Sequence, residues 1–216
     1  MATVVFVRHG RTAANARGVL AGRSAGVGLD EVGREQATRT AERLAAVPLA
    51  AVVSSPLMRC RQTARAILDR QAGAPAAPVD RGFIEADYGS WQGRALSELA
   101  REPLWSVVQS RPSAAEFPGG ESLTAMQARA LAALRRHDEA VEAASGAASV
   151  FAVVTHADII KSLIVAAQGR PLDEFQRVQV APASVSIVRY RGEEAEVLGV
   201  NTHDGDLAEF LDGVRR

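Results

Sequence analysis

The chain has 216 residues, of which 47% are hydrophobic and 23% charged, ordinary proportions for a globular protein that buries a core. Its 25 basic and 25 acidic side chains give a formal net charge of zero, which argues against a general binder of nucleic acid or anionic membranes. Cys60 is the single cysteine, so no disulfide can form within the chain. No apolar run approaches the ~20 residues of a membrane span, and the pattern before the first strand leads us to expect no secretory leader. We therefore expect a cytoplasmic protein.

Short apolar segments predict five strands. Three of the segments are continuously apolar and rich in β-branched residues, which is typical of strands buried on both faces. The last two look like a final pair near the end of the chain. The five segments are residues 3–7 (TVVFV), 50–54 (AAVVS), 150–155 (VFAVVT), 183–190 and 195–200.

Helices are predicted between these strands, and most of them have a recognisable first residue. Asp30 and Ser122 are suited to cap two of them, and Ser55-Pro56 resembles the cap and first residue of a third. Pro103 is expected to interrupt a fourth. The helical segments are residues 30–46, 55–70, 94–110, 122–144 and 158–168.

The alternation of strands and helices predicts an α/β fold. We expect a three-layer α/β/α sandwich with a mostly parallel central sheet, formed by a single domain over residues 1–216. Residues 82–120 are less regular, and we expect them to form a small cap over the site.

Basic residues follow the ends of two of the buried strands. Arg8-His9-Gly10 comes directly after the first strand, and Thr155-His156-Ala157 ends the third. Ligands of parallel α/β sheets bind beyond the carboxyl ends of the strands, so the two histidines should meet there. Each could instead be a hydrogen-bonded structural histidine, but a matched pair beside arginines favours a functional site.

Arg59 supplies an independent signal. It falls in the first turn of a predicted helix, where the helix dipole disfavours a cation. An anion bound near that helix end would offset this cost. Alternatively, Arg59 could be exposed to solvent, where the cost is negligible and no anion is needed.

Two guanidinium groups and two imidazoles around one point suit a phosphoryl group. The sequence has no GxxxxGK[ST] motif, which makes an NTPase improbable. Phosphoryl transfer without a metal needs a nucleophile, for which histidine is suitable, and an acid that protonates the leaving oxygen. Glu85, in FIEADYGSWQG, is the best candidate for that acid because aromatic residues surround it, and Asp87 is the second choice.

The sequence resembles the histidine phosphatase superfamily, whose fold is phosphoglycerate-mutase-like. The matching segments follow the family's order and spacing and span most of the chain. It is similar in particular to an actinobacterial group of phosphomutase-like and acid-phosphatase-like proteins. The segments are VRHGRT (7–12) followed by Asn15, LDEVGREQA (29–37), SSPLMRCRQTA (54–64), EADYGSWQG (85–93), PGGES (118–122) and VTHAD (154–158).

The resemblance implies a role for each candidate residue. His9 would become the phosphohistidine and Glu85 would be the proton donor. No metal or cofactor is implied, and the expected partner is a small phosphorylated metabolite, with a homodimer left open. The residues implied to bind phosphate are Arg8, Arg59, His156 and Asn15, with the Ala157 N–H as a further donor.

Other polar residues of these segments are expected to lie outside the chemistry. Arg11 would add positive potential at the mouth of the site or face solvent, and Gln92 stands where the family commonly has Glu. His137 is expected to be solvated within a charged helix. His203 is left open between a structural role and participation in the site.

Several rival functions remain. GRSAG (22–26) fits the GxSxG pattern of serine hydrolases, but that motif needs a strand before it and a helix after it. A metal-dependent hydrolase could use His156, Asp158 and the His203-Asp204 pair, without the usual ligand context. A catalytically weak phosphate-binding module would lack the nucleophile or the acid, and both candidates are present.

Within the family, the alternative is a cofactor-dependent phosphoglycerate mutase. Mutases of this fold are longer and carry an ERHYG-type segment. The corresponding segment here is EADYG, in which Ala86 and Asp87 replace the two basic residues. We therefore predict a phosphatase for small phosphomonoesters.

Overall fold

A computed structural model describes residues 2–192 and 194–207. Its centre is a five-stranded sheet with strand order β2-β3-β1-β4-β5. β1, β2 and β3 are parallel, whereas β4 is antiparallel to both β1 and β5. The sheet is therefore mixed, with β4 alone reversed. The strands are β1 (Thr3–Arg8), β2 (Ala51–Ser54), β3 (Val150–Thr155), β4 (Val185–Arg191) and β5 (Glu194–Thr202).

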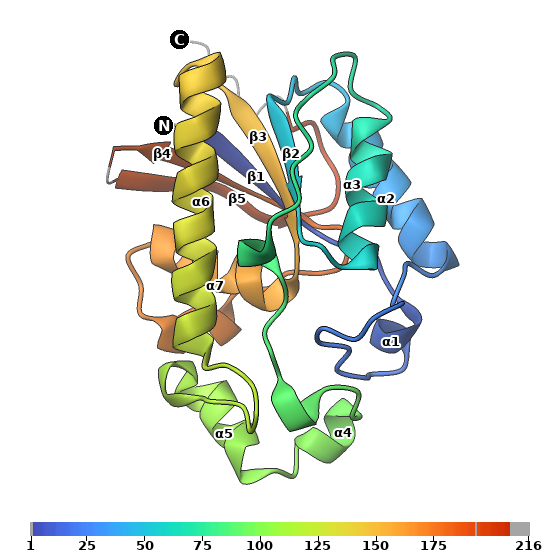
Figure 1. The fold of residues 1–216 in the computed structure, drawn as a ribbon, viewed down its shortest axis with the longest axis vertical. Coiled ribbons are helices and arrows are strands. Elements are labelled where there is room, and N and C mark those ends of the chain that lie inside the picture. The colour runs from blue at the N-terminus through green and yellow to red at the C-terminus, as the bar shows by residue number, and fades with distance from the viewer. Residues whose placement is uncertain (1, 193, 208–216) are drawn as a thin grey trace.

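Helices cover both faces of the sheet, as Figure 1 shows, so the three-layer α/β fold is confirmed. Alternate residues of β1 point to opposite faces: Val4 and Phe6 pack with α6 and α7, and Val5 and Val7 with α2 and α3. The α-helices are α1 (Ala13–Ala16), α2 (Glu31–Leu44), α3 (Met58–Leu68), α4 (Leu96–Leu99), α5 (Pro103–Ser110), α6 (Leu123–Ser145) and α7 (Ala157–Ala167).

Two of the predicted helix caps are confirmed and one is wrong. The Asp30 carboxylate accepts a hydrogen bond from the Gly33 N–H at the start of α2, and Ser122 Oγ accepts one from the Ala125 N–H at the start of α6. Ser55 does not cap α3, which begins at Met58 without a side-chain cap. Its hydroxyl is used in the site instead.

Residues 82–120 contain little regular structure beyond two short helices. α4 and α5 are separate, with Pro103 as the first residue of α5, as the sequence predicted. Both lie together at one end of the molecule, beyond the sheet (Figure 1). The 3₁₀ turns of the chain are η1 (Arg81–Phe83), η2 (Gly89–Trp91), η3 (Pro112–Ala114) and η4 (Leu172–Arg177).

Among the described residues, no helix is both long enough and apolar enough to cross a membrane.

Candidate active site

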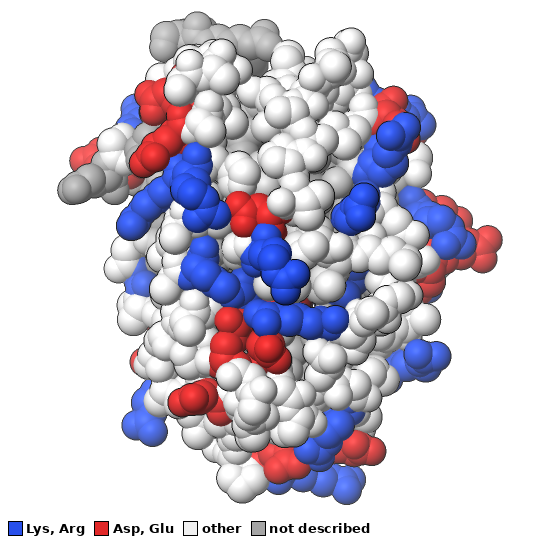
Figure 2. All heavy atoms as spheres, in the orientation of Figure 1, with Lys and Arg blue, Asp and Glu red and all other residues white. Residues whose placement is uncertain are grey.

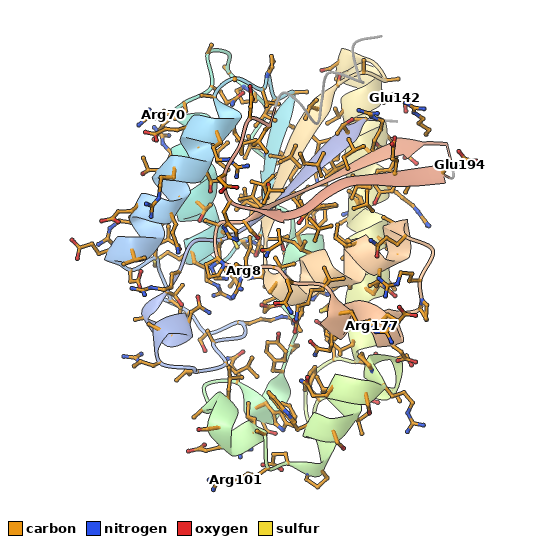
Figure 3. The ribbon with its side chains drawn as sticks, turned by 180° about the vertical axis from the view of Figure 1, so that it is seen from behind. Arg8, Arg70, Arg101, Glu142, Arg177 and Glu194 are labelled. Atoms are coloured by element: carbon orange, nitrogen blue, oxygen red, sulfur yellow. The ribbon has the colours of Figure 1, made fainter. Side chains whose placement is uncertain are left out.

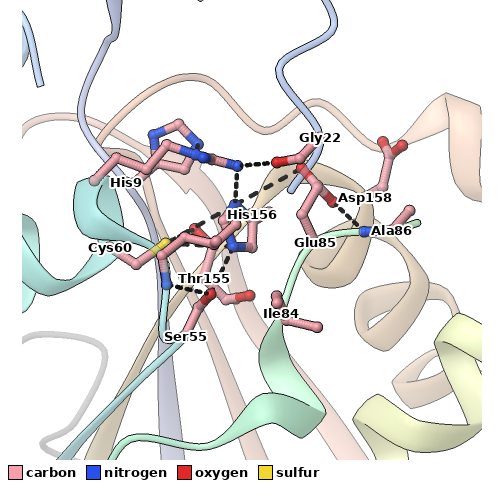
Figure 4. Close-up of polar contacts among 12 residues, drawn as sticks. His9, Gly22, Ser55, Cys60, Ile84, Glu85, Ala86, Thr155, His156 and Asp158 are labelled. Carbon is pink, nitrogen blue, oxygen red and sulfur yellow. Dashed lines mark hydrogen bonds and ion pairs between the residues drawn. The ribbon is translucent and has the colours of Figure 1, made fainter. Parts of the chain in front are cut away.

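His9 and His156 lie side by side because the register of two parallel strands places them there. Arg8 of β1 pairs with Thr155 of β3, and the next residue of each chain segment is a histidine. The His9 N–H donates to the Thr155 carbonyl at 3.0 Å. The two imidazole centroids are 5.3 Å apart in an edge-to-face arrangement (Figure 4).

The hydrogen bonds of His9 define which ring nitrogen is free. Nδ1 is 2.7 Å from the Gly10 carbonyl oxygen, which can only accept, so Nδ1 carries the proton. Nε2 then has a lone pair, and it accepts a hydrogen bond from Arg59 Nε at 3.2 Å. Burial, followed by the charges of Arg59 and Arg8, lowers the pKa of His9 well below its ordinary value. His9 is thus held neutral, with a nucleophilic nitrogen facing a guanidinium.

Gly10 allows the loop that carries His9 to pack directly against the start of α2. A Cβ at Gly10 would lie 2.3 Å from the Gly33 carbonyl oxygen, so the loop after β1 can touch the first turn of α2 only if residue 10 lacks a side chain.

Arg59 is the second residue of α3, and its side chain is only 2% exposed. Nη2 donates to the Gly22 carbonyl at 2.8 Å and lies 3.3 Å from His156 Nδ1. Nη1 is buried without a hydrogen-bond partner among the described residues. A buried cationic donor without an acceptor is costly, so this group is prepared for an anion.

Arg8 is the second guanidinium. Figure 3 shows it near the centre of the molecule, whereas Arg70 and Arg101 lie at the periphery. Nη1 donates to the Val180 carbonyl at 2.7 Å, and Nε is buried without a partner in the part of the chain that is described. Burial lowers the pKa of Arg8, partly offset by nearby carboxylates.

Glu85 lies across from the histidines (Figure 4). It is 8% exposed; Oε1 accepts from the Ala86 N–H at 3.0 Å, and Oε2 is 3.7 Å from His156 Nδ1. Burial, and then the negative charge of Asp158, raise the pKa of Glu85 to about 7. The carboxyl group is therefore partly protonated near neutral pH.

His156 is fully buried and held by Ser55, whose Oγ is 2.8 Å from His156 Nε2. This contact explains why Ser55 does not cap α3. Burial, followed by Arg59, lowers the pKa of His156 well below its ordinary value. Cys60 lies 3.5 Å from the same ring, but burial raises the pKa of its thiol to about 12, so it is no thiolate nucleophile.

A cavity of about 280 Å³ joins these groups to the irregular segment. Its lining combines charged and polar groups with aromatic and aliphatic side chains. The charged and polar residues include Arg8, His9, Asn15, Arg59, Glu85, Asp158 and Lys161, and the apolar ones include Tyr88, Trp91, Leu96, Trp105, Val108, Phe117 and Ala157.

The structure thus brings together all six predicted site residues. Asn15 is at the edge of the cavity, where its Oδ1 accepts from the Thr12 N–H and hydroxyl. Two neighbours were missed: Asp158, which accepts from the Tyr88 hydroxyl at 2.8 Å, and Ser55. Asp158 stands two residues after His156 in VTHAD, a signal that we assigned only to the metal alternative.

The remaining polar candidates lie elsewhere. Arg11 pairs with Asp30 at 2.9 Å, and Asp87 pairs with Arg23 at 2.9 Å. His203 is exposed. His137 is not simply solvated, because its Nε2 is 2.8 Å from Asp80 Oδ2. That prediction was wrong because it ignored a carboxylate 57 positions away in the chain.

Two rival sites are not supported by the geometry. Gly22 to Gly26 form turns, with no strand before Ser24 and no helix directly after it, so the nucleophile elbow of a serine hydrolase is absent there. Within the described residues, no group of three His, Cys, Asp or Glu side chains is arranged to hold a metal ion.

Comparison with known proteins extends these observations. The chain is 32% identical over 214 residues to a glucosyl-3-phosphoglycerate phosphatase of Mycolicibacterium vanbaalenii, with 97% of this chain and 89% of the relative covered. It is 30% identical over 184 residues to a 2,3-bisphosphoglycerate-dependent phosphoglycerate mutase of Gloeobacter violaceus, covering 83% and 82%. A bifunctional protein of Mycobacterium tuberculosis is 31% identical over 94% of this chain, which spans only 54% of that relative's length.

The fold has close structural counterparts. The solved structure of YhfR from Bacillus stearothermophilus matches with a TM-score of 0.83 and 26% identity, covering 95% of this chain and 99% of the other. The family model of the histidine phosphatase superfamily (branch 1) matches residues 4–203. The chain therefore belongs to the histidine phosphatase superfamily, branch 1.

Proposed function

We propose that this protein is a metal-independent phosphatase that hydrolyses small phosphomonoesters through a phosphohistidine at His9. One observation carries the proposal: the unprotonated Nε2 of a neutral, buried His9 faces the same cavity as a carboxyl group, Glu85, whose pKa is about 7. The nucleophile and the acid are thus in the protonation states that the first step requires.

In the first step, His9 Nε2 attacks phosphorus and forms the N–P bond while the bond to the leaving oxygen breaks. Glu85 gives its proton to that oxygen, and the alcohol departs. In the second step, a water molecule attacks the phosphohistidine, Glu85 takes a proton from it, and the N–P bond breaks to release inorganic phosphate.

The charge on the transferring phosphoryl group would be stabilised by the groups around His9. Arg59 Nη1 and Arg8 Nε are buried donors without partners among the described residues, and a phosphoryl group would supply acceptors for them. Asn15 would contribute a further contact from the same cavity, and His156, whose Nδ1 lies 3.3 Å from Arg59 Nη2, would contribute one from directly behind it. A phosphate at His9 would also replace the bond that Arg59 now makes to Nε2.

We propose that residues 82–120 act as a cap that selects the alcohol part of the substrate. Trp91 and Trp105 line the cavity with their rings stacked at a centroid distance of 6.3 Å. The small volume and the aromatic walls favour a small, partly apolar alcohol. The free, buried thiol of Cys60 fits a reducing compartment, and the proposed location is the cytoplasm.

The second candidate is a phosphoglycerate mutase, which the similarity to the Gloeobacter violaceus mutase favours. A mutase needs a second anion site. Lys161 is the cation in the cavity that could serve, but Asp158 lies 3.8 Å from its Nζ and offsets its charge.

A panel of phosphomonoesters assayed for release of inorganic phosphate tests this assignment, with interconversion of 2- and 3-phosphoglycerate measured in parallel. We expect phosphate release that is lost in His9→Ala, and mutase activity that is absent or trace. Robust interconversion would favour the mutase, and phosphate release by a folded His9→Ala protein would overturn the mechanism.

A further inference from the structure

The GRSAG segment has no role in the proposed chemistry as a motif, yet two of its residues contact both halves of the site. The Gly22 carbonyl accepts from Arg59 Nη2 at 2.8 Å, as Figure 4 shows. The next residue, Arg23, donates from Nε to the main-chain carbonyl of Glu85, also at 2.8 Å. Gly22 therefore holds the guanidinium of Arg59, and the adjacent Arg23 holds the backbone of Glu85.

A second arginine holds the Glu85 segment from the other side. Arg129 of α6 donates from Nη2 to the Glu85 carbonyl at 3.1 Å and from Nη1 to the Gly82 and Ile84 carbonyls at 2.8 Å each. These bonds fix the backbone that leads to the acid.

Glu121 joins the two arginines. Its carboxylate accepts from Arg23 Nη2 at 2.8 Å and from Arg129 Nη2 at 2.6 Å, and also from the Asp87 N–H at 2.9 Å. Burial alone would raise the pKa of Glu121, but the bonds from Arg129 and the Asp87 N–H outweigh it and lower the pKa, so the carboxylate stays ionised. Arg23, Arg129, Glu121 and the Glu85 backbone thus form a closed network of charge-assisted hydrogen bonds. Such bonds are short and directional, so they restrict how far the Glu85 backbone can move.

The network is close to neutral as a whole. Arg23 and Arg129 are balanced by Glu121 and Asp87, the last of which accepts from Arg23 Nη1 at 2.9 Å. Figure 2 shows basic and acidic side chains directly beside one another across the middle of this face. The network therefore adds little net charge near Glu85, and its contribution is positional.

The backbone of the GRSAG segment is itself constrained at Gly22. Gly22 has φ +51°, and a Cβ there would lie 2.8 Å from Gln92 Oε1. The same oxygen accepts from the Arg23 N–H at 2.8 Å. Gln92, which is expected to lie outside the chemistry, holds this turn, in which the Gly22 carbonyl faces Arg59 and the Arg23 side chain faces the Glu85 backbone.

We propose that Arg23 is a positioning residue that, together with Glu121, fixes the Glu85 carboxyl group relative to His9 and Arg59. The proposal rests on the proposed function, because it assumes that Glu85 donates a proton to the leaving oxygen. Arg23 touches neither His9 nor the Glu85 carboxyl in the contacts described, so its effect must pass through the Glu85 backbone.

Single-turnover phosphorylation of His9 tests this in Arg23→Ala and Glu121→Gln, with an alkyl phosphate and with p-nitrophenyl phosphate. p-Nitrophenolate leaves almost unaided, so a displaced acid should matter only for the alkyl substrate. We expect a loss of about 10–100-fold for the alkyl phosphate and less than about threefold for p-nitrophenyl phosphate. Arg23→Lys, which keeps one donor, should recover part of the alkyl rate.

Arg94→Ala is the matched control, since Arg94 forms a half-buried ion pair with Glu102 at 2.7 Å and does not line the cavity. Phosphorylation of His9 in Arg94→Ala should be as fast as in the wild type with both substrates. Equal losses for the two substrates, or no loss, in both folded variants would overturn the positional role while leaving the phosphatase intact. Failure of the wild-type protein to phosphorylate His9 would instead reject the proposed function.

Discussion

At the scale of the residue, the same cause shifts two pKa values in opposite directions: burial lowers the pKa of His9 and raises that of Glu85. Burial disfavours charge on both, so the imidazole loses its proton more readily and the carboxyl group keeps its own. Burial is the largest cause of both pKa shifts, and Arg59 then acts on His9 and Asp158 on Glu85.

The role of Glu85 as acid can be separated from simple electrostatics. Glu85→Gln keeps the size of the side chain but cannot release a proton. We expect phosphorylation of His9 by an alkyl phosphate to fall by ~10²–10⁴, and phosphorylation by p-nitrophenyl phosphate to fall far less. Single-turnover rates are needed because both substrates share the hydrolysis step.

If the two substrates lost equal activity in Glu85→Gln, Glu85 would not be the acid. Asp87→Asn is the comparison variant. Asp87 is paired with Arg23 in the structure, so we expect Asp87→Asn to show at most the modest leaving-group dependence of Arg23→Ala, far below that of Glu85→Gln.

Residue types and spacing were sufficient to predict which side chains the fold brings together beyond the ends of β1 and β3, but not the partners that hold them. His9, His156 and Arg59 follow recognisable strand ends and a helix start, which are local features of the sequence. Ser55 and His156 are 101 positions apart, and nothing local to SSP distinguishes a serine that caps a helix from one that holds an imidazole. Partners of this kind depend on tertiary contacts.

At the scale of the element, the parallel pairing of β1 with β3 places His9 beside His156. Both strands are continuously apolar, so their burial was predictable, and the in-register pairing of Arg8 with Thr155 then sets the histidines side by side. The reversal of β4 was not predicted. Its sequence, VSIVRYR, carries no signal for strand direction, which is set by the chain connections rather than by composition.

The proposed cap gives an element-scale prediction through Trp105 of α5. Trp105→Ala removes the ring that stacks on Trp91 and opens one wall of the cavity. We expect KM for p-nitrophenyl phosphate to rise several-fold while KM for glycerol phosphate changes by less than about twofold, with kcat little affected for both.

Trp105→Phe, which keeps an aromatic wall, should behave much as the wild type does. A change of KM by the same factor for both substrates in Trp105→Ala would show that α5 does not select the alcohol.

At the scale of the whole molecule, the three layers place two apolar cores on either side of one sheet and leave the polar residues to gather at its carboxyl edge. The layers follow from hydrophobic patterning alone, because alternate residues of each buried strand must face a helix. The shape of the cavity could not be predicted, since it depends on how the irregular residues 82–120 pack against that edge.

Keeping Glu85 buried should reduce the stability of the whole molecule at high pH. Its pKa is about 7 in the folded state against an ordinary value of 4.5, so the folded state binds more protons between these values. The free energy of unfolding therefore falls as pH rises from 4.5 to 7, by at most about 3 kcal/mol for this shift. The lowered pKa values of His9 and His156 act in the opposite sense below 6.5.

Comparison of wild type with Glu85→Gln isolates the carboxyl contribution, because the histidine contributions are common to both proteins. We expect Glu85→Gln to be more stable than wild type by about 1–3 kcal/mol at pH 8 and nearly equal to it near pH 4. Urea denaturation at the two pH values measures this. A stability difference independent of pH would contradict a buried, raised-pKa carboxyl group.

The central claim is that His9 carries the phosphoryl group. The direct measurement is rapid quenching of the protein during turnover of a ³²P-labelled phosphomonoester, followed by mapping of the labelled residue. We expect an acid-labile, base-stable label on His9 that is chased by unlabelled substrate and absent from His9→Ala. Label on a serine, or turnover without any label on His9, would contradict the account.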